Sequence, residues 1–177
     1  NHIKKDITTI GWTGTISSNK YLKIIEKNIM EISLHRKIKL IIIGNFSYSL
    51  KNVDVEVIQW NKYNEIKDLL KIDIGIYPLD TDQWVLGKSG LKALQYMALG
   101  IPSVSTAVGN IKNIVKNEYN GFLVNNTKEW EQVLIKLIDN PELRNKIGLN
   151  GLKTIENKYS IQALNKKYVD IFDKLKK

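Results

Sequence analysis

The chain has 177 residues, 43% of them hydrophobic and 25% charged, which suits one globular domain with its own core. It contains no cysteine and only two histidines, His2 and His35. Disulfides, zinc–thiolate sites and cysteine nucleophiles are therefore excluded, and a Ser-His-Asp hydrolase or a multi-histidine metal site is disfavoured. The formal net charge of +9 favours an anionic partner, although lysines spread from Lys4 to Lys177 are explained at least as well by solvated surface charge.

Short β-branched runs alternate with helical stretches, the pattern of a parallel sheet with helices on its faces. Strands are expected at residues 8–12, 39–43, 53–58, 72–77, 103–105 and 121–124. Between them, helices are expected at residues 19–36, 64–70, 90–99 and 109–116, with a loop at residues 78–89. The first helix carries an apolar stripe at helical spacing, formed by Leu22, Ile25, Ile29 and Ile32.

The remainder of the chain is expected to be helical. One stripe comprises Trp130, Val133, Leu134, Leu137 and Ile138, Pro141 starts the next helix, and a last stripe comprises Ile161, Leu164, Tyr168, Ile171 and Leu175. We expect an α/β fold: a single Rossmann-like, doubly wound parallel sheet of about six strands over residues 1–177, with helices on both faces and a helical C-terminal tail. No apolar run approaches the roughly 18 residues of a membrane span, and the polar residues 1–6 do not begin a signal peptide.

Open parallel sheets bind ligands beyond the carboxyl ends of their strands. Four loops should meet at that edge, at residues 14–19, 59–61, 78–89 and 106–109. Gly11 and Gly14 do not complete the G-x-G-x-x-G fingerprint of nicotinamide-binding sheets, so we expect no such cofactor.

The third of these loops leads into the most informative stretch, GKSGLKALQYMALGIP at residues 87–102. The first backbone amides of its helix, near Gly90 and Leu91, have no partner within the helix and form an anion site together with the helix dipole. Gly90 lets a phosphate approach the backbone, with Ser89 beside it, and Lys88 adds a positive charge. The alternative is an ordinary strand–loop–helix connection with a lysine that extends into solvent.

The first loop offers hydroxyl groups at the start of a helix. Thr15, Ser17 and Ser18 follow Gly14 and precede the helix expected at Asn19, where hydroxyls can donate hydrogen bonds to phosphate. The alternative is that Ser17 or Ser18 is simply the N-cap of that helix.

Three segments together resemble the donor site of retaining glycosyltransferases of family four: residues 87–102, the continuation SVSTAVG, and the later NGFLV at residues 120–124. This family, also described as glycosyl transferases group 1, has the GT-B fold. The similarity runs from Ile10 to about Tyr159. It implies that the chain is the C-terminal, nucleotide-sugar-binding half of a two-domain enzyme, without the N-terminal acceptor domain. It also implies a UDP- or GDP-linked sugar as co-substrate, no metal, no other cofactor, and transfer with retention.

This sequence departs from the family at two positions. Members usually carry two glutamates eight residues apart, the first on the donor sugar and the second on the ribose, and here Gly87 and Gln95 stand in their places. Gln95 keeps the capacity to hydrogen-bond a ribose, whereas Gly87 offers no carboxylate. Asp80 or Asp82 is a candidate to replace the missing carboxylate, the alternative being that both are ordinary exposed acids.

The resemblance also assigns roles to other residues. Many members place an arginine and a lysine on the diphosphate, where this chain has Thr15 and Lys20. Trp60 and Asn61 match the nucleobase position, where Trp60 either stacks on the base or packs on the domain surface. We expect Lys20 and Lys88 to be the catalytic cations that stabilise the leaving diphosphate. The expected donor-binding residues are Gly14, Thr15, Ser17, Trp60, Asn61, Ser89, Gly90, Leu91 and Gln95.

The first function we expect is that of a glycosyltransferase donor domain, inactive without its N-terminal domain, in the cytoplasmic synthesis of a polysaccharide or glycoconjugate. Peripheral association of the full enzyme with the inner face of the membrane is an option. The alternative is a catalytically degenerate nucleotide-sugar-binding or interaction module, for which Gly87 and Gln95 are the evidence. A binder of nucleic acid or of membrane surfaces is disfavoured because no aromatic-basic recognition motif occurs. We assign His35 no catalytic role.

Overall fold

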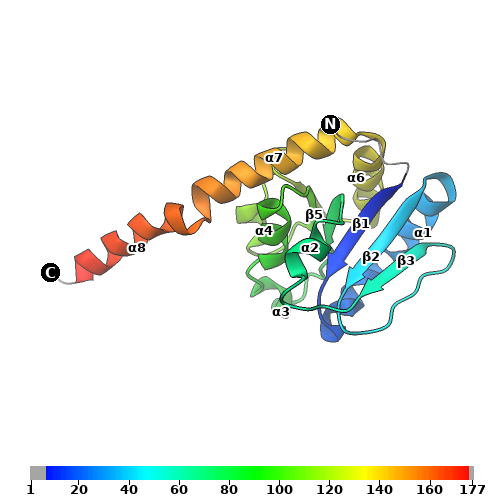
Figure 1. Ribbon diagram of the computed structural model, residues 1–177, viewed down its shortest axis with the longest axis horizontal. Coiled ribbons are helices and arrows are strands. Elements are labelled where there is room, and N and C mark those ends of the chain that lie inside the picture. Colours follow the sequence, from blue (N-terminus) through cyan, green and yellow to red (C-terminus); the bar gives the residue numbers. More distant parts are fainter. Residues whose placement is uncertain (1–6, 176–177) are drawn as a thin grey trace.

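Six parallel strands form one sheet in the order β3-β2-β1-β4-β5-β6 (Figure 1). The structure, a computed structural model, describes residues 7–175, so residues 1–6, which include His2, and residues 176–177 lie outside the described part. The strands are β1 Thr8–Thr13, β2 Ile38–Ile43, β3 Asp54–Ile58, β4 Ile74–Tyr77, β5 Ser103–Thr106 and β6 Phe122–Val124. The predicted Rossmann-like parallel sheet is confirmed, and each strand end lies within two residues of its expected place.

The strand order creates a crevice at the carboxyl edge of the sheet. β1 and β4 lie side by side at the centre, and the chain continues outward through β2 and β3 on one side and through β5 and β6 on the other. The loops that follow β1 and β4 therefore leave in opposite directions. Sheets of this order bind their ligands between those two loops.

One face of the sheet is covered by α1 (Glu26–His35) and α6 (Thr127–Asp139). Both predicted stripes are buried against it, with Val133 and Ile138 partly buried at the edge of the second. The strand side chains that receive them are largely β-branched, as expected for a sheet buried on both faces. His35 is the last residue of α1, where a basic side chain suits the helix dipole.

The opposite face is covered by α2 (Glu65–Leu69) and α4 (Leu91–Ala98), and α7 (Pro141–Lys158) packs against α4. Pro141 occupies the first turn of α7, as predicted. The helices on the two faces confirm the doubly wound arrangement.

The single helix expected at residues 19–36 is wrong, because two helices occupy this segment. A 3-10 helix, η1, runs over Ile16–Ile24, and α1 begins only at Glu26. Serine and asparagine side chains in the segment compete for backbone hydrogen bonds, which weakens an α-helix there. The N-cap is Thr15 instead of Ser17 or Ser18, and the Thr15 amide donates to Ser18 Oγ at 3.1 Å.

The loop expected at residues 78–89 contains a short helix, α3 (Gln83–Leu86). Asp82 caps it, because its carboxylate accepts a hydrogen bond from the Val85 amide at 2.8 Å. The helix expected at residues 109–116 is also shorter than predicted, since α5 covers only Ile111–Ile114.

Helix α4 ends where α7 crosses it. Gly100 follows the helix with a φ of +69°, the left-handed conformation that commonly stops a helix, as the sequence predicted. Gly148 of α7 lies against this turn so closely that a methyl group there would overlap the Gly100 carbonyl oxygen. The two glycines therefore set how near α7 approaches α4.

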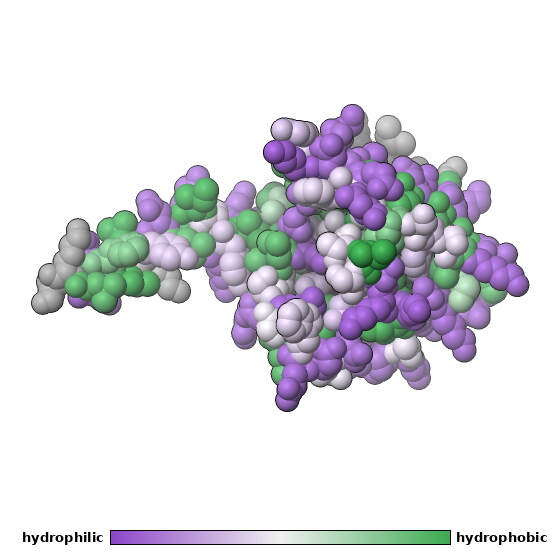
Figure 2. Space-filling view, turned by 90° about the horizontal axis from the view of Figure 1, so that it is seen from below, coloured by the Kyte–Doolittle hydropathy of each residue, from purple (hydrophilic) through white to green (hydrophobic). Residues whose placement is uncertain are grey.

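Helix α8 (Ile161–Leu175) projects away from the sheet (Figure 1). Its apolar side chains are exposed to solvent, among them Ile161, Tyr168, Phe172 and Leu175, and Figure 2 shows apolar surface along this projection. The predicted helical tail is confirmed, but within residues 7–175 its apolar stripe is left largely uncovered. Within residues 7–175, no helix is both long and apolar enough to span a bilayer.

Replacing Gly148 with alanine should destabilise the protein. The added methyl group must push α7 away from the Gly100 carbonyl, and overpacking of this kind lowers the free energy of unfolding by about 2 kcal/mol. Gly151→Ala is the matched control, because it lies on the same helix and its methyl group would overlap no backbone atom, with the Met97 side chain at 3.2 Å and the Asn120 carbonyl oxygen at 3.4 Å. Chemical denaturation measures both variants, and equal stabilities would contradict the packing we describe.

Candidate functional site

The loop after β1 forms one side of the crevice. A methyl group at Gly14 would overlap the indole ring of Trp12, so this loop lies directly on the end of the sheet. Beyond it, the hydroxyl oxygens of Thr15 and Ser17 lie 2.9 Å apart. Both residues are exposed. Their hydroxyl groups are therefore accessible to a ligand in the crevice.

The start of α4 forms the other side. Gly90, its N-cap, has a φ of +83°, and a methyl group there would lie 2.5 Å from Ile114 Cδ1, so both conformation and packing require glycine. The Ser89 carbonyl accepts a hydrogen bond from Asn110 Nδ2 at 2.9 Å, which holds the preceding loop. Among the described residues, no side chain caps this helix. The amides that begin at Leu91 therefore remain available to an anion.

The two lysines predicted to be catalytic meet at one aromatic ring. Lys20 Nζ lies 5.1 Å from the centre of the Tyr21 ring, and Lys88 Nζ lies 5.5 Å from the same centre. Lys20 comes from η1 and Lys88 from the loop before α4, so the two sides of the crevice each contribute one cation. Their catalytic role stays a prediction.

Lys92 is a third cation that the sequence did not single out. It lies four residues before the buried Tyr96, and therefore on the same, sheet-facing side of α4. Its Nζ lies 5.2 Å from the centre of the Tyr77 ring and 5.7 Å from that of Trp12. The sequence signal that could have identified Lys92 is a lysine at a position where helical spacing predicts a buried, apolar residue.

We call Lys20, Lys88 and Lys92 the cation cluster. Within residues 7–175, no carboxylate lies within 4.0 Å of any of these three ammonium groups. Burial lowers the pKa of Lys92 to about 8, and the nearby charge of Lys88 acts in the same direction. The cluster is thus a concentration of positive charge that an anion would stabilise.

The residues predicted to bind the nucleoside converge on a carboxylate that the sequence did not suggest. Glu65 Oε1 accepts a hydrogen bond from Trp60 Nε1 at 3.1 Å and one from Gln95 Nε2 at 3.3 Å. Trp60 is 43% exposed, so a ring face is accessible. Asn61 is exposed nearby, and its side chain accepts from the Tyr63 amide at 2.9 Å.

The position of the missing first glutamate is open. Gly87 ends α3 with a φ of −78°, and a methyl group there would meet its nearest neighbour at 3.7 Å. Asp82 is engaged as the cap of α3, and Asp80 accepts from the Thr81 amide at 2.7 Å. Both acids therefore shape the local backbone, and their suggested role toward the donor sugar stays a prediction.

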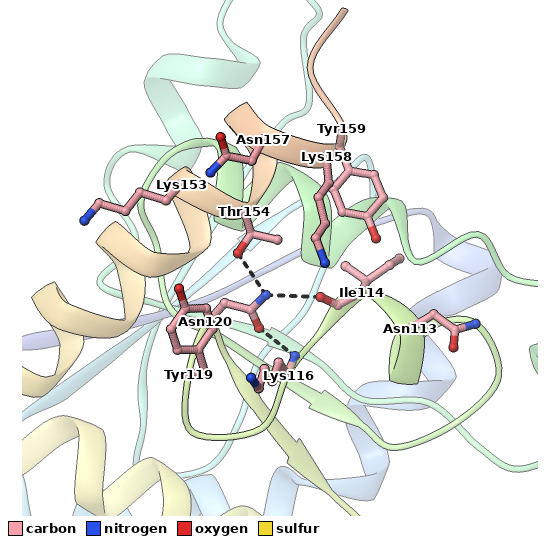
Figure 3. A pocket seen from close by; sticks show the side chains of 10 residues that line it. All are labelled: Asn113, Ile114, Lys116, Tyr119, Asn120, Lys153, Thr154, Asn157, Lys158 and Tyr159. Carbon is pink, nitrogen blue, oxygen red and sulfur yellow. Dashed lines mark hydrogen bonds between the residues drawn. The ribbon is translucent and has the colours of Figure 1, made fainter. Parts of the chain in front are cut away.

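A separate hollow of about 280 Å³ lies between α5, the turn that follows it and the end of α7 (Figure 3). Lys116, Lys153 and Lys158 line it, and Figure 3 shows Lys158 directed into it and Lys153 directed away. Asn120 closes its floor with hydrogen bonds from its amide nitrogen to the Ile114 carbonyl and the Thr154 hydroxyl, both 3.2 Å long. Its lysines are exposed to solvent, so this hollow lacks the desolvated cation that marks the crevice.

The family described as "Glycosyl transferases group 1" matches residues 1–154. The chain belongs to this family. CapM of Staphylococcus aureus, named as a capsular polysaccharide biosynthesis glycosyltransferase, is 25% identical over 173 residues, which are 90% of this chain and 44% of CapM. The chain thus spans less than half the length of this relative.

Solved structures share the fold. The C-terminal domain of LpcC from Francisella tularensis, a glycosyl transferase group 1 family protein, superposes with a TM-score of 0.69 at 24% identity, over 88% of this chain and 87% of that one. HepE of Anabaena, in complex with UDP-glucose, gives a TM-score of 0.70 at 12% identity, over 96% of this chain and 49% of HepE. The predicted GT-B resemblance is therefore confirmed at the level of fold.

Replacing Lys92 with methionine should change how the stability depends on pH. The folded protein releases the Lys92 proton near its lowered pKa of about 8, whereas the unfolded chain holds it until about 10.5. Between these values the unfolded state binds more protons, so the free energy of unfolding rises with pH, by on the order of 2 kcal/mol. We expect the Lys92→Met variant to lack this rise in urea titrations. Parallel pH profiles for the two proteins would refute the burial of this charge.

Proposed function

We propose that the chain is the donor-binding half of a glycosyltransferase. It binds a nucleotide-diphosphate sugar and, with an N-terminal partner domain, transfers the sugar to an acceptor with retention of configuration. The observation that carries this proposal is the meeting of Lys20, Lys88 and Lys92 beside the uncapped start of α4.

The mechanism we derive is electrostatic. As the bond from the sugar to the diphosphate breaks, negative charge grows on the leaving oxygen. Cations and backbone amides already in place stabilise that charge without reorganisation. Lys88 and Lys20 act from the two sides of the crevice, and Thr15 and Ser17 donate hydroxyl hydrogen bonds. The site needs no metal in this scheme, because the cation cluster supplies the positive charge.

Support for a nucleotide sugar comes from the relatives. HepE was solved with UDP-glucose, and 49% of the HepE chain shares its fold with 96% of this one. A capsular polysaccharide enzyme among the relatives favours the synthesis of a surface polysaccharide or glycoconjugate.

The surface around the crevice favours contact with a second domain. Ile16, Trp84, Leu86 and Leu91 are apolar and more than half exposed, and all four lie on the loops and helices that border the crevice. An exposed apolar rim of this kind marks an interaction surface. Together with the bare stripe of α8, it agrees with an N-terminal domain that closes the site, and we therefore expect the present chain to bind donor without turnover.

A binding module without catalysis is the second candidate. It is favoured by Gly87, where no carboxylate is available to the donor sugar, and by the local engagement of Asp80 and Asp82. Such a module would still bind nucleotide. The two candidates separate when the chain is combined with its N-terminal half, since only the enzyme would then consume a sugar nucleotide.

Titration calorimetry with UDP, GDP and ADP tests the donor site. We expect micromolar binding of one of them, and we expect Lys88→Ala to weaken that diphosphate about ten-fold while leaving the matching nucleoside unchanged. Affinity should also fall as the pH rises through about 8, because Lys92 then loses its charge in the free protein.

Lys116→Ala is the matched control, because it removes a lysine that also lies over a ring, 5.2 Å from the centre of Tyr119, but in the separate hollow. It should bind as the unchanged protein does. Equal losses for diphosphate and nucleoside in Lys88→Ala would reject the phosphate role, and the absence of any nucleotide binding would reject the proposed function.

A further inference from the structure

Glu65 is the only carboxylate, among the described residues, that accepts hydrogen bonds from two of the predicted donor-binding side chains. The indole of Trp60 reaches it from the loop after β3, and the amide of Gln95 reaches it from α4. A neighbouring loop and a helix 30 residues further along the chain thus hold one side chain at a fixed place on the carboxyl side of the sheet.

The second oxygen of this carboxylate is available. Both hydrogen bonds end on Oε1, and within residues 7–175 no partner is recorded for Oε2. A carboxylate accepts about four hydrogen bonds, so Glu65 retains most of its capacity. It is partly exposed, and therefore accessible to a ligand that lies along α4.

The charges along α4 distinguish the two ends of a ligand. The cation cluster lies at the first turn, and Gln95, which holds Glu65, lies one turn further from Leu91, about 5.4 Å along the axis. A phosphate is attracted to the first turn and repelled by the carboxylate. A neutral group that donates hydrogen bonds is favoured beside Glu65 instead.

Ribose is the neutral group that fits this place. Its two neighbouring hydroxyls donate a pair of hydrogen bonds, and carboxylates bind the ribose hydroxyls at the same edge of other doubly wound sheets. Beyond the ribose, the exposed ring of Trp60 offers a surface on which a base can stack, and its indole nitrogen is tied to Glu65.

We propose that Glu65 is the ribose-binding residue of this chain, and that Gln95 and Trp60 are positioning residues that orient its carboxylate. The inference rests on the proposed function, and it assigns to α2 the ribose-binding carboxylate that Gln95 does not provide. The ligand class that follows is a ribonucleoside diphosphate, with discrimination against its 2′-deoxy analogue.

Calorimetry with paired ligands tests this assignment on the full chain. UDP is compared with 2′-deoxy-UDP, GDP with 2′-deoxy-GDP, and inorganic pyrophosphate serves as the probe without ribose. The unchanged protein should bind the ribonucleotide about ten-fold more tightly than its deoxy analogue. Glu65→Ala should bind both equally, and its affinity for pyrophosphate should not fall.

Glu142→Ala is the matched control, because Glu142 is likewise an acid in the first turn of a helix and its loss changes the net charge equally. It should keep the ten-fold discrimination. Glu65→Gln keeps the size of the side chain, so it serves as a second variant should the alanine variant fail to fold. The same ratio of ribonucleotide to deoxyribonucleotide affinity is measured for it. We expect it to lose most of the discrimination, because the charge is gone.

Three results would overturn the inference while leaving the proposed function intact: an unchanged ratio in both Glu65 variants, equal binding of ribo and deoxy ligands by the unchanged protein, or a parallel loss of pyrophosphate binding in both variants. Failure of the unchanged protein to bind UDP, GDP and pyrophosphate alike would overturn both proposals together.

Discussion

The position of α4 on the sheet depends on one contact, that of the Tyr96 ring with Gly75. The ring atoms lie 2.5 Å from where a methyl group at Gly75 would stand, and Tyr96 is completely buried. Its hydroxyl donates to the Ile76 carbonyl at 3.3 Å, so the ring also has a fixed depth. On the far side of α4, Gly148 of α7 lies directly on the turn that ends the helix. Because α4 is held from both sides, its first turn has a defined place at the crevice before any ligand arrives.

That placement explains why a charged residue faces the sheet. The side of α4 that carries Tyr96 also carries Lys92 one turn earlier, and there the sheet has ended at Tyr77. The helix therefore extends beyond the strand ends, and its inward-facing side becomes a wall of the crevice. The lowered pKa of Lys92 expresses the unfavourable free energy of holding a charge there, and a bound anion would relieve it. A stability penalty accepted at one residue is typical of a binding site prepared for its ligand.

The sequence predicted those features whose signals are local. The β-branched runs located all six strands, and glycine followed by proline located the end of α4. The signals failed where side chains compete with the backbone, as in the segment from Ile16 to Ile24, where serine hydroxyls bond to the chain and a 3-10 helix results. The four-residue α3 was missed because so short a helix shows no periodicity. Glu65 was missed for a different reason: its contact with Gln95 joins residues 30 positions apart, and only the packing of α2 beside α4 reveals it.

The net charge of +9 does not by itself locate a binding site on the surface. Most of the lysines that the structure describes are exposed, including those of the hollow beside α7, and water already stabilises their charges. The cation cluster differs because its three lysines lie together at the crevice and the ammonium group of Lys92 is largely withdrawn from water. An attraction between a charge and its ligand is stronger where water is excluded, since the effective dielectric constant is lower. Specific recognition of a phosphate therefore depends on the desolvated Lys92, whereas the many exposed lysines contribute a general attraction that salt would screen.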